Sequence, residues 1–169
     1  QAPAQLRKIR WRQVDVVLED STGAKPKSCP LTAELDGYFS GVAKAGAGTR
    51  YRFRVNNARN FYPDPASRFQ PDGPHGSSCI VDPTQFRWSD TQWSGLKLNG
   101  QIFYEMHIGT FTKEGPWGAA AEQLPELARI GITVIEMMPV AGFPGRFGWG
   151  YDGVDLFAPS HLYGTPDDL

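Results

Sequence analysis

The stretch "QIFYEMHIGTFTKEGPWGAAAEQLPELARIGITVIEMMPV", Gln101 to Val140, decides the fold of the second half of the chain. Its first nine residues alternate in polarity as a strand does, and its last nine form the apolar run of a buried strand. Between them lie apolar residues at helical spacing, followed by Gly131, a natural helix stop. These helical positions are Ala120, Leu124, Leu127 and Ala128. Strand, helix and strand in this order predict a parallel βαβ unit.

Two features of this unit qualify the prediction. Pro125 lies inside the helical pattern and removes one backbone hydrogen bond, so we expect a kink there or a later start of the helix. No G-x-G-x-x-G pattern follows the first strand, which argues against a dinucleotide-binding unit.

The two predicted strands carry candidate catalytic groups. Glu105 and His107 share one face of the first strand, and Glu136 lies within the second. Neighbouring parallel strands could bring the two glutamates together, and a pair of carboxylates is what glycoside hydrolysis requires. The alternative is that they are buried polar residues satisfied within the strand layer. Both lie mid-strand, whereas barrel chemistry sits at the C-terminal strand ends, so the structural interpretation is favoured. A single histidine such as His107 is also more often structural.

The segment "GFPGRFGWGYDGVDLFAP", Gly142 to Pro159, follows the second strand and is rich in glycine and aromatic residues. Glycines allow sharp turns, and exposed rings beside a strand end often form a ligand surface. Trp149 and Tyr151 offer flat apolar faces beside Asp152, a hydrogen-bond acceptor. Sugars have apolar C–H faces and hydroxyl rims, so this combination suits them. The alternative is a tight loop whose rings only pack.

The first 100 residues have a different pattern. Residues 1–60 predict short strands of a small antiparallel β-sandwich, of which "VDVVL" (14–18) and "TRYRFRV" (49–55) are the clearest. In the latter, apolar residues alternate with Arg52 and Arg54, which predicts a solvated arginine face. "LTAEL" and "YFSGVA" are further strand candidates. Residues 61–100 begin with a proline-rich run and predict an ordered connector, on which two tryptophans are expected to pack.

Composition excludes several classes of protein. The chain is 40% hydrophobic and 21% charged, as ordinary soluble proteins are. A net charge of −1 gives no electrostatic case for binding nucleic acid or an anionic membrane. Cys29 and Cys79 are too few for a disulfide framework and are not spaced for a metal, so we expect reduced thiols and a cytoplasmic location. The first residues lack an initiator Met and a signal core, so the chain is expected to start inside a longer sequence.

Three segments carry a resemblance to a known family. "YEMHIGTFTKEG", "ELARIGITVIEMMPVAGFPG" and "WGYDGVDLFAPSHLYGTPDDL" resemble the opening strands of the catalytic barrel of the α-amylase family of glycoside hydrolases. Within it they most resemble the malto-oligosyltrehalose trehalohydrolases, and "PDPASRFQPDGPHG" resembles the link between sandwich and barrel in that group. The resemblance covers residues from about 50 to 169. Branching enzymes share "WGY" and the following "FAP"-like run.

The resemblance implies a fold in two parts. Residues 1–60 would form an immunoglobulin-like sandwich of the carbohydrate-binding-module type, and 61–100 the connector. Residues 101–169 would begin a (β/α)8 TIM barrel, truncated here because such a barrel needs about 250 residues. Two parallel strands and one helix leave apolar edges uncovered, so residues 101–169 are not expected to form a stable domain alone.

The resemblance also implies a mechanism and a site. Family members are retaining glycosidases with an Asp nucleophile, a Glu general acid and a supporting Asp on later strands. No residue up to Leu169 matches these three, so no catalytic residue is assigned and the 169 residues alone are expected to be inactive. Tyr151 matches the aromatic platform under the sugar at the cleavage site, flanked by Trp149 and Asp152. The implied substrate is an α-glucan or maltooligosaccharide, and no cofactor is implied.

Three functions stay open at this point. The first is a trehalohydrolase, which releases trehalose from a maltooligosaccharide ending in that disaccharide. The second is a glycogen- or starch-branching transferase of the same family. The third is a carbohydrate-binding module with no chemistry of its own.

Overall fold

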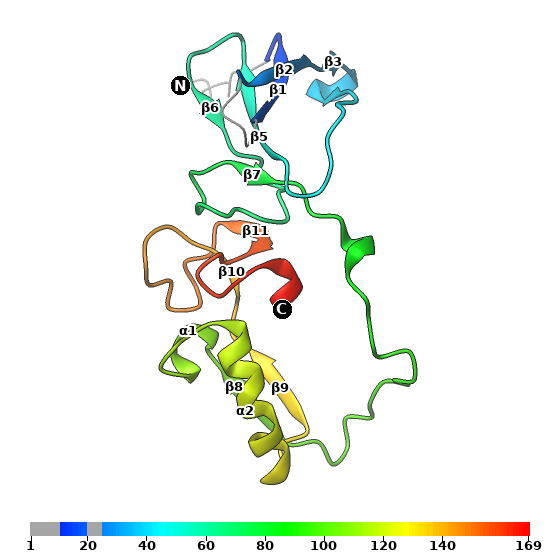
Figure 1. Ribbon diagram of the computed structural model, residues 1–169, viewed down its shortest axis with the longest axis vertical. Helices are drawn as coiled ribbons and strands as arrows, with labels where there is room; N and C mark the ends of the chain where they lie inside the picture. Colours follow the sequence, from blue (N-terminus) through cyan, green and yellow to red (C-terminus); the bar gives the residue numbers. More distant parts are fainter. Residues whose placement is uncertain (1–10, 20–24) are drawn as a thin grey trace, which may run out of the picture.

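The computed structural model describes residues 11–19 and 25–169 of the 169-residue chain. It is elongated, with an antiparallel sheet at one end and a βαβ unit at the other (Figure 1). The elements of the first half are β1 (Val14–Glu19), β2 (Lys27–Pro30), β3 (Thr32–Ala33), η1 (Leu35–Gly37), β4 (Phe39–Ser40), β5 (Arg50–Val55), β6 (Phe61–Tyr62), β7 (Ser78–Cys79) and η2 (Pro83–Gln85). Those of the second half are β8 (Phe103–Met106), α1 (Ile108–Phe111), α2 (Trp117–Arg129), β9 (Val134–Met137), β10 (Ala141–Gly142), β11 (Asp155–Pro159) and η3 (Pro166–Asp168).

The first half is built on one antiparallel sheet. Its strand order is β2-β1-β5-β6, with β7 also paired to β5. This confirms the predicted antiparallel strands β1 and β5. The second sheet expected for a sandwich is limited, within the described part of residues 1–60, to the two-residue strands β3 and β4. The run "GVAKAGAG" (41–48) before β5 explains this difference, because glycine and alanine are poor strand formers.

The arginine face of β5 is paired rather than simply solvated, as the alternation had suggested. Asp15 on β1 lies opposite Arg54 and is almost fully buried, and its Oδ2 is 3.0 Å from Arg54 Nη2. Arg52 binds Glu19 at 2.6 Å. The alternating arginines thus meet the acidic residues of the neighbouring strand, which stabilises the β1–β5 register.

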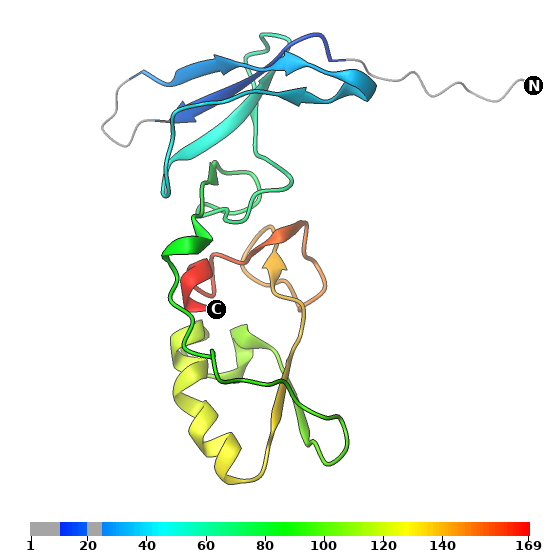
Figure 2. The same cartoon turned by 90° about the vertical axis from the view of Figure 1, so that its right-hand side faces the viewer.

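The proline-rich run after β5 is ordered because hydrogen bonds tie it to the sheet. The Tyr51 hydroxyl donates to Asp64 at 2.7 Å, and the backbone N–H of Asp64 donates to Ser78 Oγ at 2.8 Å. Burial and the Asp64 carboxylate raise the pKa of the Tyr51 phenol. Beyond η2 the chain runs beside the lower half without helix or strand until β8 (Figure 2). The two tryptophans expected to pack there, Trp88 and Trp93, are 71% and 67% exposed.

The predicted parallel βαβ unit is confirmed. β8 and β9 pair in parallel from Phe103↔Val134 to Met106↔Met137, with α2 between them in sequence. The helix begins at Trp117 and continues through Pro125, so a later start is wrong. It ends at Arg129, just before Gly131 at φ +102°.

The helix α2 packs mainly through its first turn. Trp117 and Ala120 join a buried cluster with Met106, Ile108, Phe143 and Tyr163. Leu127 is buried, whereas Leu124 is 40% exposed, so only part of the predicted apolar face lies in the core. The ordered first turn explains why the helix tolerates Pro125, since packing on both sides of the proline outweighs one missing hydrogen bond.

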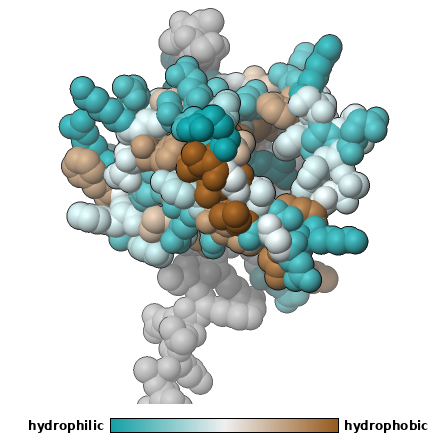
Figure 3. All heavy atoms as spheres, turned by 90° about the horizontal axis from the view of Figure 1, so that it is seen from below, coloured by the Kyte–Doolittle hydropathy of each residue, from teal (hydrophilic) through white to brown (hydrophobic). Residues whose placement is uncertain are grey.

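The end of the molecule that carries α2, β8 and β9 keeps apolar surface exposed. Ile102, Phe103 and Met137 are each about half exposed, at 53%, 48% and 44%. Viewed from that end, hydrophobic side chains lie at the surface among hydrophilic ones (Figure 3). The expectation of uncovered apolar surface on this unit is therefore confirmed. Within residues 11–19 and 25–169, no helix is long and apolar enough to cross a membrane.

Candidate functional site

A cavity of about 770 Å³ opens at the carboxyl ends of the parallel strands. His107 directly follows β8 and Met138 directly follows β9, and both line this cavity. The Met138 N–H donates to the Met106 carbonyl at 3.0 Å, so the two strand ends lie at one edge. Ligands of α/β folds bind at this edge, and the volume is within the range of small-molecule sites.

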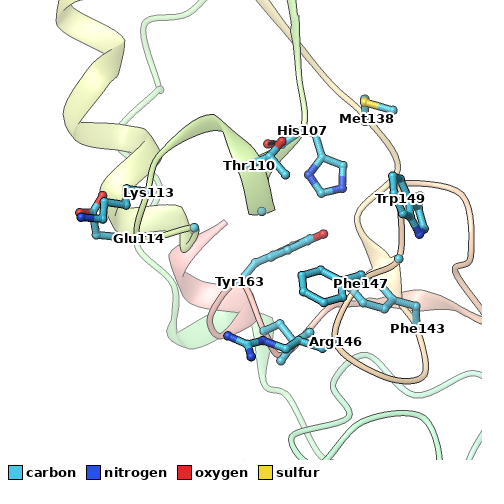
Figure 4. Close-up of a pocket in the computed structure, with 14 residues that line it drawn as sticks. His107, Thr110, Lys113, Glu114, Met138, Phe143, Arg146, Phe147, Trp149 and Tyr163 are labelled. Atoms are coloured by element: carbon cyan, nitrogen blue, oxygen red, sulfur yellow. Dashed lines mark hydrogen bonds between the residues drawn. The ribbon is translucent and has the colours of Figure 1, made fainter.

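The opposite wall of the cavity is the glycine- and aromatic-rich segment after β9. The sequence suggested only a sharp turn, but β10 and β11 pair as antiparallel strands and hold residues 143–154 as a closed loop. The Val154 N–H donates to the Gly142 carbonyl at 2.8 Å across its base. Phe147 and Trp149 extend from this loop toward the cavity (Figure 4).

The backbone around Trp149 is strained. Its φ of +53° lies in the left-handed region, which costs a residue with a side chain roughly 1–2 kcal/mol. Gly148 in front of it packs directly on the Phe143 ring, where a Cβ would lie 2.5 Å from the ring carbons. The indole is 77% exposed, so burial does not offset the strain. A strained backbone that holds an exposed ring over a cavity points to a functional role for that ring.

The three site residues named from the sequence are not equivalent in the structure. Trp149 lines the cavity. Tyr151 and Asp152 follow on the same turn, and their backbone N–H groups donate to the Gly148 carbonyl at 2.9 and 3.0 Å. Tyr151 is 73% exposed and Asp152 is exposed too, but neither side chain lines the cavity. Of the two rings named from the sequence, Trp149 therefore lies at the cavity and Tyr151 lies outside its lining.

The glutamates of the two strands lie next to each other, as their order suggested. Glu105 is the register partner of Glu136 in the parallel pair. Both are exposed, so their interpretation as buried polar residues is wrong for this structure. Neither lines the cavity, which begins one residue beyond each strand.

The inner wall of the cavity contains two polar rings: His107, which the sequence offered as a candidate but favoured as structural, and Tyr163, which the sequence did not single out. His107 and Tyr163 lie edge to face with ring centroids 6.1 Å apart. Burial raises the pKa of the Tyr163 phenol further above neutral pH. The position of His107 just after a parallel strand was the available signal. Tyr163 comes from the segment after β11, and no local pattern marks it as a cavity residue.

Metal and thiol chemistry find little support in the described residues. No group of three or more His, Cys, Asp or Glu side chains is placed to hold a metal ion in the part of the chain that the structure describes. Cys29 and Cys79 are both free. The cytoplasmic location expected from these cysteines stays a prediction.

The base of the aromatic loop contains a buried carboxyl. Asp155 is 7% exposed, and its Oδ2 has no hydrogen-bond partner among the described residues. Burial raises the pKa of Asp155, and the positive charge of His75 lowers it in part. Because this pKa is raised in the folded state, the free energy of unfolding falls as the pH rises through the folded-state pKa. Above that pH the folded protein must hold a buried negative charge.

We therefore expect Asp155→Asn to raise the free energy of unfolding at pH 7.5. At pH 3.5, below the pKa of about 3.9 for an Asp in an unfolded chain, the advantage should shrink. The Asp155 carboxyl is then mostly neutral in both the folded and the unfolded protein. Urea denaturation at the two pH values measures this. An advantage that grows as the pH falls would show that the Asp155 carboxylate is stabilising.

Comparisons with known proteins address the family. No family model matches the chain. It is 50% identical over 139 residues to a malto-oligosyltrehalose trehalohydrolase from Deinococcus radiodurans, which covers 82% of this chain and 23% of that protein. It is 33% identical over 141 residues to a 1,4-alpha-glucan branching enzyme from Xanthomonas oryzae, covering 75% of this chain and 19% of that enzyme.

Solved structures show the same similarity in three dimensions. A crystal structure from Salmonella typhimurium, assigned as an alpha amylase, matches 95% of this chain and 26% of its own with 45% identity and a TM-score of 0.86. An Anoxybacillus pullulanase complexed with maltotetraose matches 94% of this chain and 28% of its own, with 22% identity and a TM-score of 0.74, which supports the fold alone. The chain spans about a quarter of the length of these proteins. The resemblance indicated by the motifs is confirmed.

Proposed function

Because the chain is related to the α-amylase family of glycoside hydrolases, we propose that it forms part of a retaining α-glycosidase that releases trehalose from maltooligosyltrehalose. One observation carries the choice within the family. Identity to the Deinococcus trehalohydrolase is 50%, against 33% to the branching enzyme over a stretch of similar length. The activity of the whole protein is part of this proposal, since the chain covers 23% of the trehalohydrolase and 19% of the branching enzyme.

The proposal gives the second half of the chain a place in a barrel. β8, α2 and β9 would be the first strand–helix–strand unit of a (β/α)8 barrel, with its ligand edge at His107 and Met138. The exposed apolar residues of this unit, among them Phe103, would then face further strands. The catalytic carboxylates would belong to those strands, since no residue of this chain matches them.

The role proposed for this chain is to bind the glucan. Trp149 would stack on a sugar ring at the cavity, Tyr151 would support the ring at the cleavage site, and Asp152 would accept hydroxyl hydrogen bonds. The strain at Trp149 and the exposure of both rings support this role. Flat aromatic faces bury apolar C–H groups at little entropic cost, because the rings have few rotatable bonds.

Product analysis on the intact protein tests the reaction. Incubation with maltooligosyltrehalose should release free trehalose. New α-1,6 branches from a linear α-glucan would instead support the branching enzyme. Glucan binding by the 169 residues, with no turnover by the intact protein, would support a carbohydrate-binding module.

Tyr151→Ala tests the binding role. We expect the variant of the 169-residue chain to bind maltotetraose roughly three- to tenfold more weakly, which is the contribution of one stacked aromatic ring. Isothermal titration calorimetry measures the affinity. Tyr38→Ala is the matched control, because Tyr38 is 72% exposed, compared with 73% for Tyr151, and lies between η1 and β4 in the first half of the chain. Equal effects of the two substitutions would remove Tyr151 from the site.

A further inference from the structure

His107 lies between the short helix α1 and the aromatic loop, each of which carries a glycine where it approaches the ring. A Cβ on Gly109, in α1, would lie 3.1 Å from His107 Cε1. A Cβ on Gly150, in the aromatic loop, would lie 3.3 Å from His107 Cδ2. The imidazole therefore fits a slot with no room for a side chain on either side, at the wall of the cavity that Trp149 also lines (Figure 4). This fit fixes the ring orientation and couples it to the aromatic loop.

The imidazole has no hydrogen-bond partner in this slot. Both ring nitrogens are buried, and neither is bonded among the described residues. The backbone carbonyl of His107 accepts from the N–H groups of Thr110 and Phe111 at 3.0 and 2.9 Å, but the side chain does not cap the helix. A neutral imidazole needs one acceptor and one donor, and leaving a buried polar group unpaired destabilises the folded state. Such groups are rare in native proteins and call for an explanation.

The surroundings of His107 indicate what the missing partner is. Tyr163 contributes a protonated phenol to the same cavity wall, with its hydroxyl 3.4 Å from the Gly109 Cβ position. The rest of the lining combines rings, including Trp149 and Phe143, with the charged side chains of Lys113, Glu114 and Arg146. A metal ion would need several ligands, and no such group is placed there in the described part of the chain. A sugar hydroxyl both donates and accepts, so it can satisfy an imidazole and a phenol together while its ring contacts aromatic faces.

We propose that His107, with Tyr163, binds a hydroxyl group of the α-glucan in this cavity and so sets how deeply the sugar enters beside Trp149. This rests on the proposed glucan-binding function and adds to it a polar contact that does not involve Tyr151 or Asp152. Binding of the hydroxyl would require the aromatic loop to move away from the imidazole, because both nitrogens are buried and Gly150 lies against the Cδ2 edge of the ring.

His107→Phe tests the proposal in the 169-residue chain. Phenylalanine removes both unpaired nitrogens but places a larger ring in a tight slot, so the two effects should offset and the free energy of unfolding should be nearly unchanged. The affinity for maltotetraose should fall roughly three- to tenfold, as expected for one lost hydrogen-bonding group. His107→Gln, which restores a donor and an acceptor near Nε2, should recover part of that affinity. A purely structural histidine would show the reverse, with lower stability and unchanged binding.

A second measurement uses the unmodified chain, so it does not depend on a variant folding. The chain contains three histidines, His75, His107 and His161. Adding maltotetraose should move the ring ¹⁵N signals of His107 and leave those of the other two in place. If Trp149→Gly weakens binding while His107→Phe and the His107 signals are unaffected, the His107 proposal fails and the glucan site stands. If the wild-type chain does not bind maltotetraose, both proposals fail.

Discussion

Trp149→Gly is expected to make the chain more stable and, at the same time, to weaken its binding of maltotetraose. Glycine adopts a φ of +53° without the steric cost that a tryptophan side chain incurs there. The indole is 77% exposed, so little buried area is lost with it. We expect the free energy of unfolding to rise by about 1 kcal/mol after the added freedom of the unfolded glycine is included. The affinity should fall roughly tenfold with the stacking surface.

A rise in stability together with a fall in affinity would distinguish a ligand-binding role of Trp149 from a packing role. Urea denaturation gives the stability, and calorimetry with maltotetraose gives the affinity. Trp88→Gly is the matched control, because Trp88 is 71% exposed but its φ is not in the left-handed region. That control should lose a little stability and keep its affinity. If Trp149→Gly lowered stability and left binding unchanged, the ring would be a packing residue.

Trp117→Ala is expected to cause the largest loss of stability, about 3–5 kcal/mol, which is the usual cost of removing a buried tryptophan. Trp117 is 4% exposed and packs edge to face on Tyr163 at 5.7 Å between centroids. Its backbone N–H also donates to the Tyr163 carbonyl at 2.8 Å. The residue therefore connects the start of α2 to the segment after β11. Its indole nitrogen has no hydrogen-bond partner among the residues that the structure describes, so the loss comes from packing.

Urea denaturation of Trp117→Ala measures this loss, with Trp93→Ala as the control. Trp93 is 67% exposed, so its removal should change stability by less than about 0.5 kcal/mol. Removing Trp117 should also disturb the cavity wall, because Tyr163 loses the ring against which it rests. A loss below 1 kcal/mol would show that α2 does not depend on this contact.

Local patterns in the sequence were sufficient for much of the fold. The βαβ unit was predicted from the change between strand and helix periodicity along residues 101–140, and the structure contains the corresponding elements β8, α2 and β9. Strands β1 and β5 followed from β-branched and alternating residues. These elements could be predicted because each is determined by its own residues. The disruptive effect of Pro125 on the helix was overestimated, because packing on either side of the proline stabilises α2.

The cavity could not be predicted in the same way. Its wall joins His107, Trp149 and Tyr163, which are separated by up to 56 positions and meet only through the tertiary fold. Trp149 was identified because glycines surround it. Tyr163 carries no such signal, and the β10–β11 pair was missed because β10 has only two residues. The exposure of Glu105 and Glu136 depends on what covers the sheet, which a strand pattern does not specify.

Nuclear magnetic resonance of the tryptophan side chains tests the central claim most directly. The chain has five tryptophans, so a ¹⁵N-labelled sample should give five indole N–H signals, and the Trp149 signal is identified by its absence from Trp149→Gly. On addition of maltotetraose we expect the Trp149 signal to shift in a saturable way, while those of Trp11, Trp88, Trp93 and Trp117 stay in place. A Trp149 signal that does not move, at concentrations where another indole does, would contradict a glucan site on this loop.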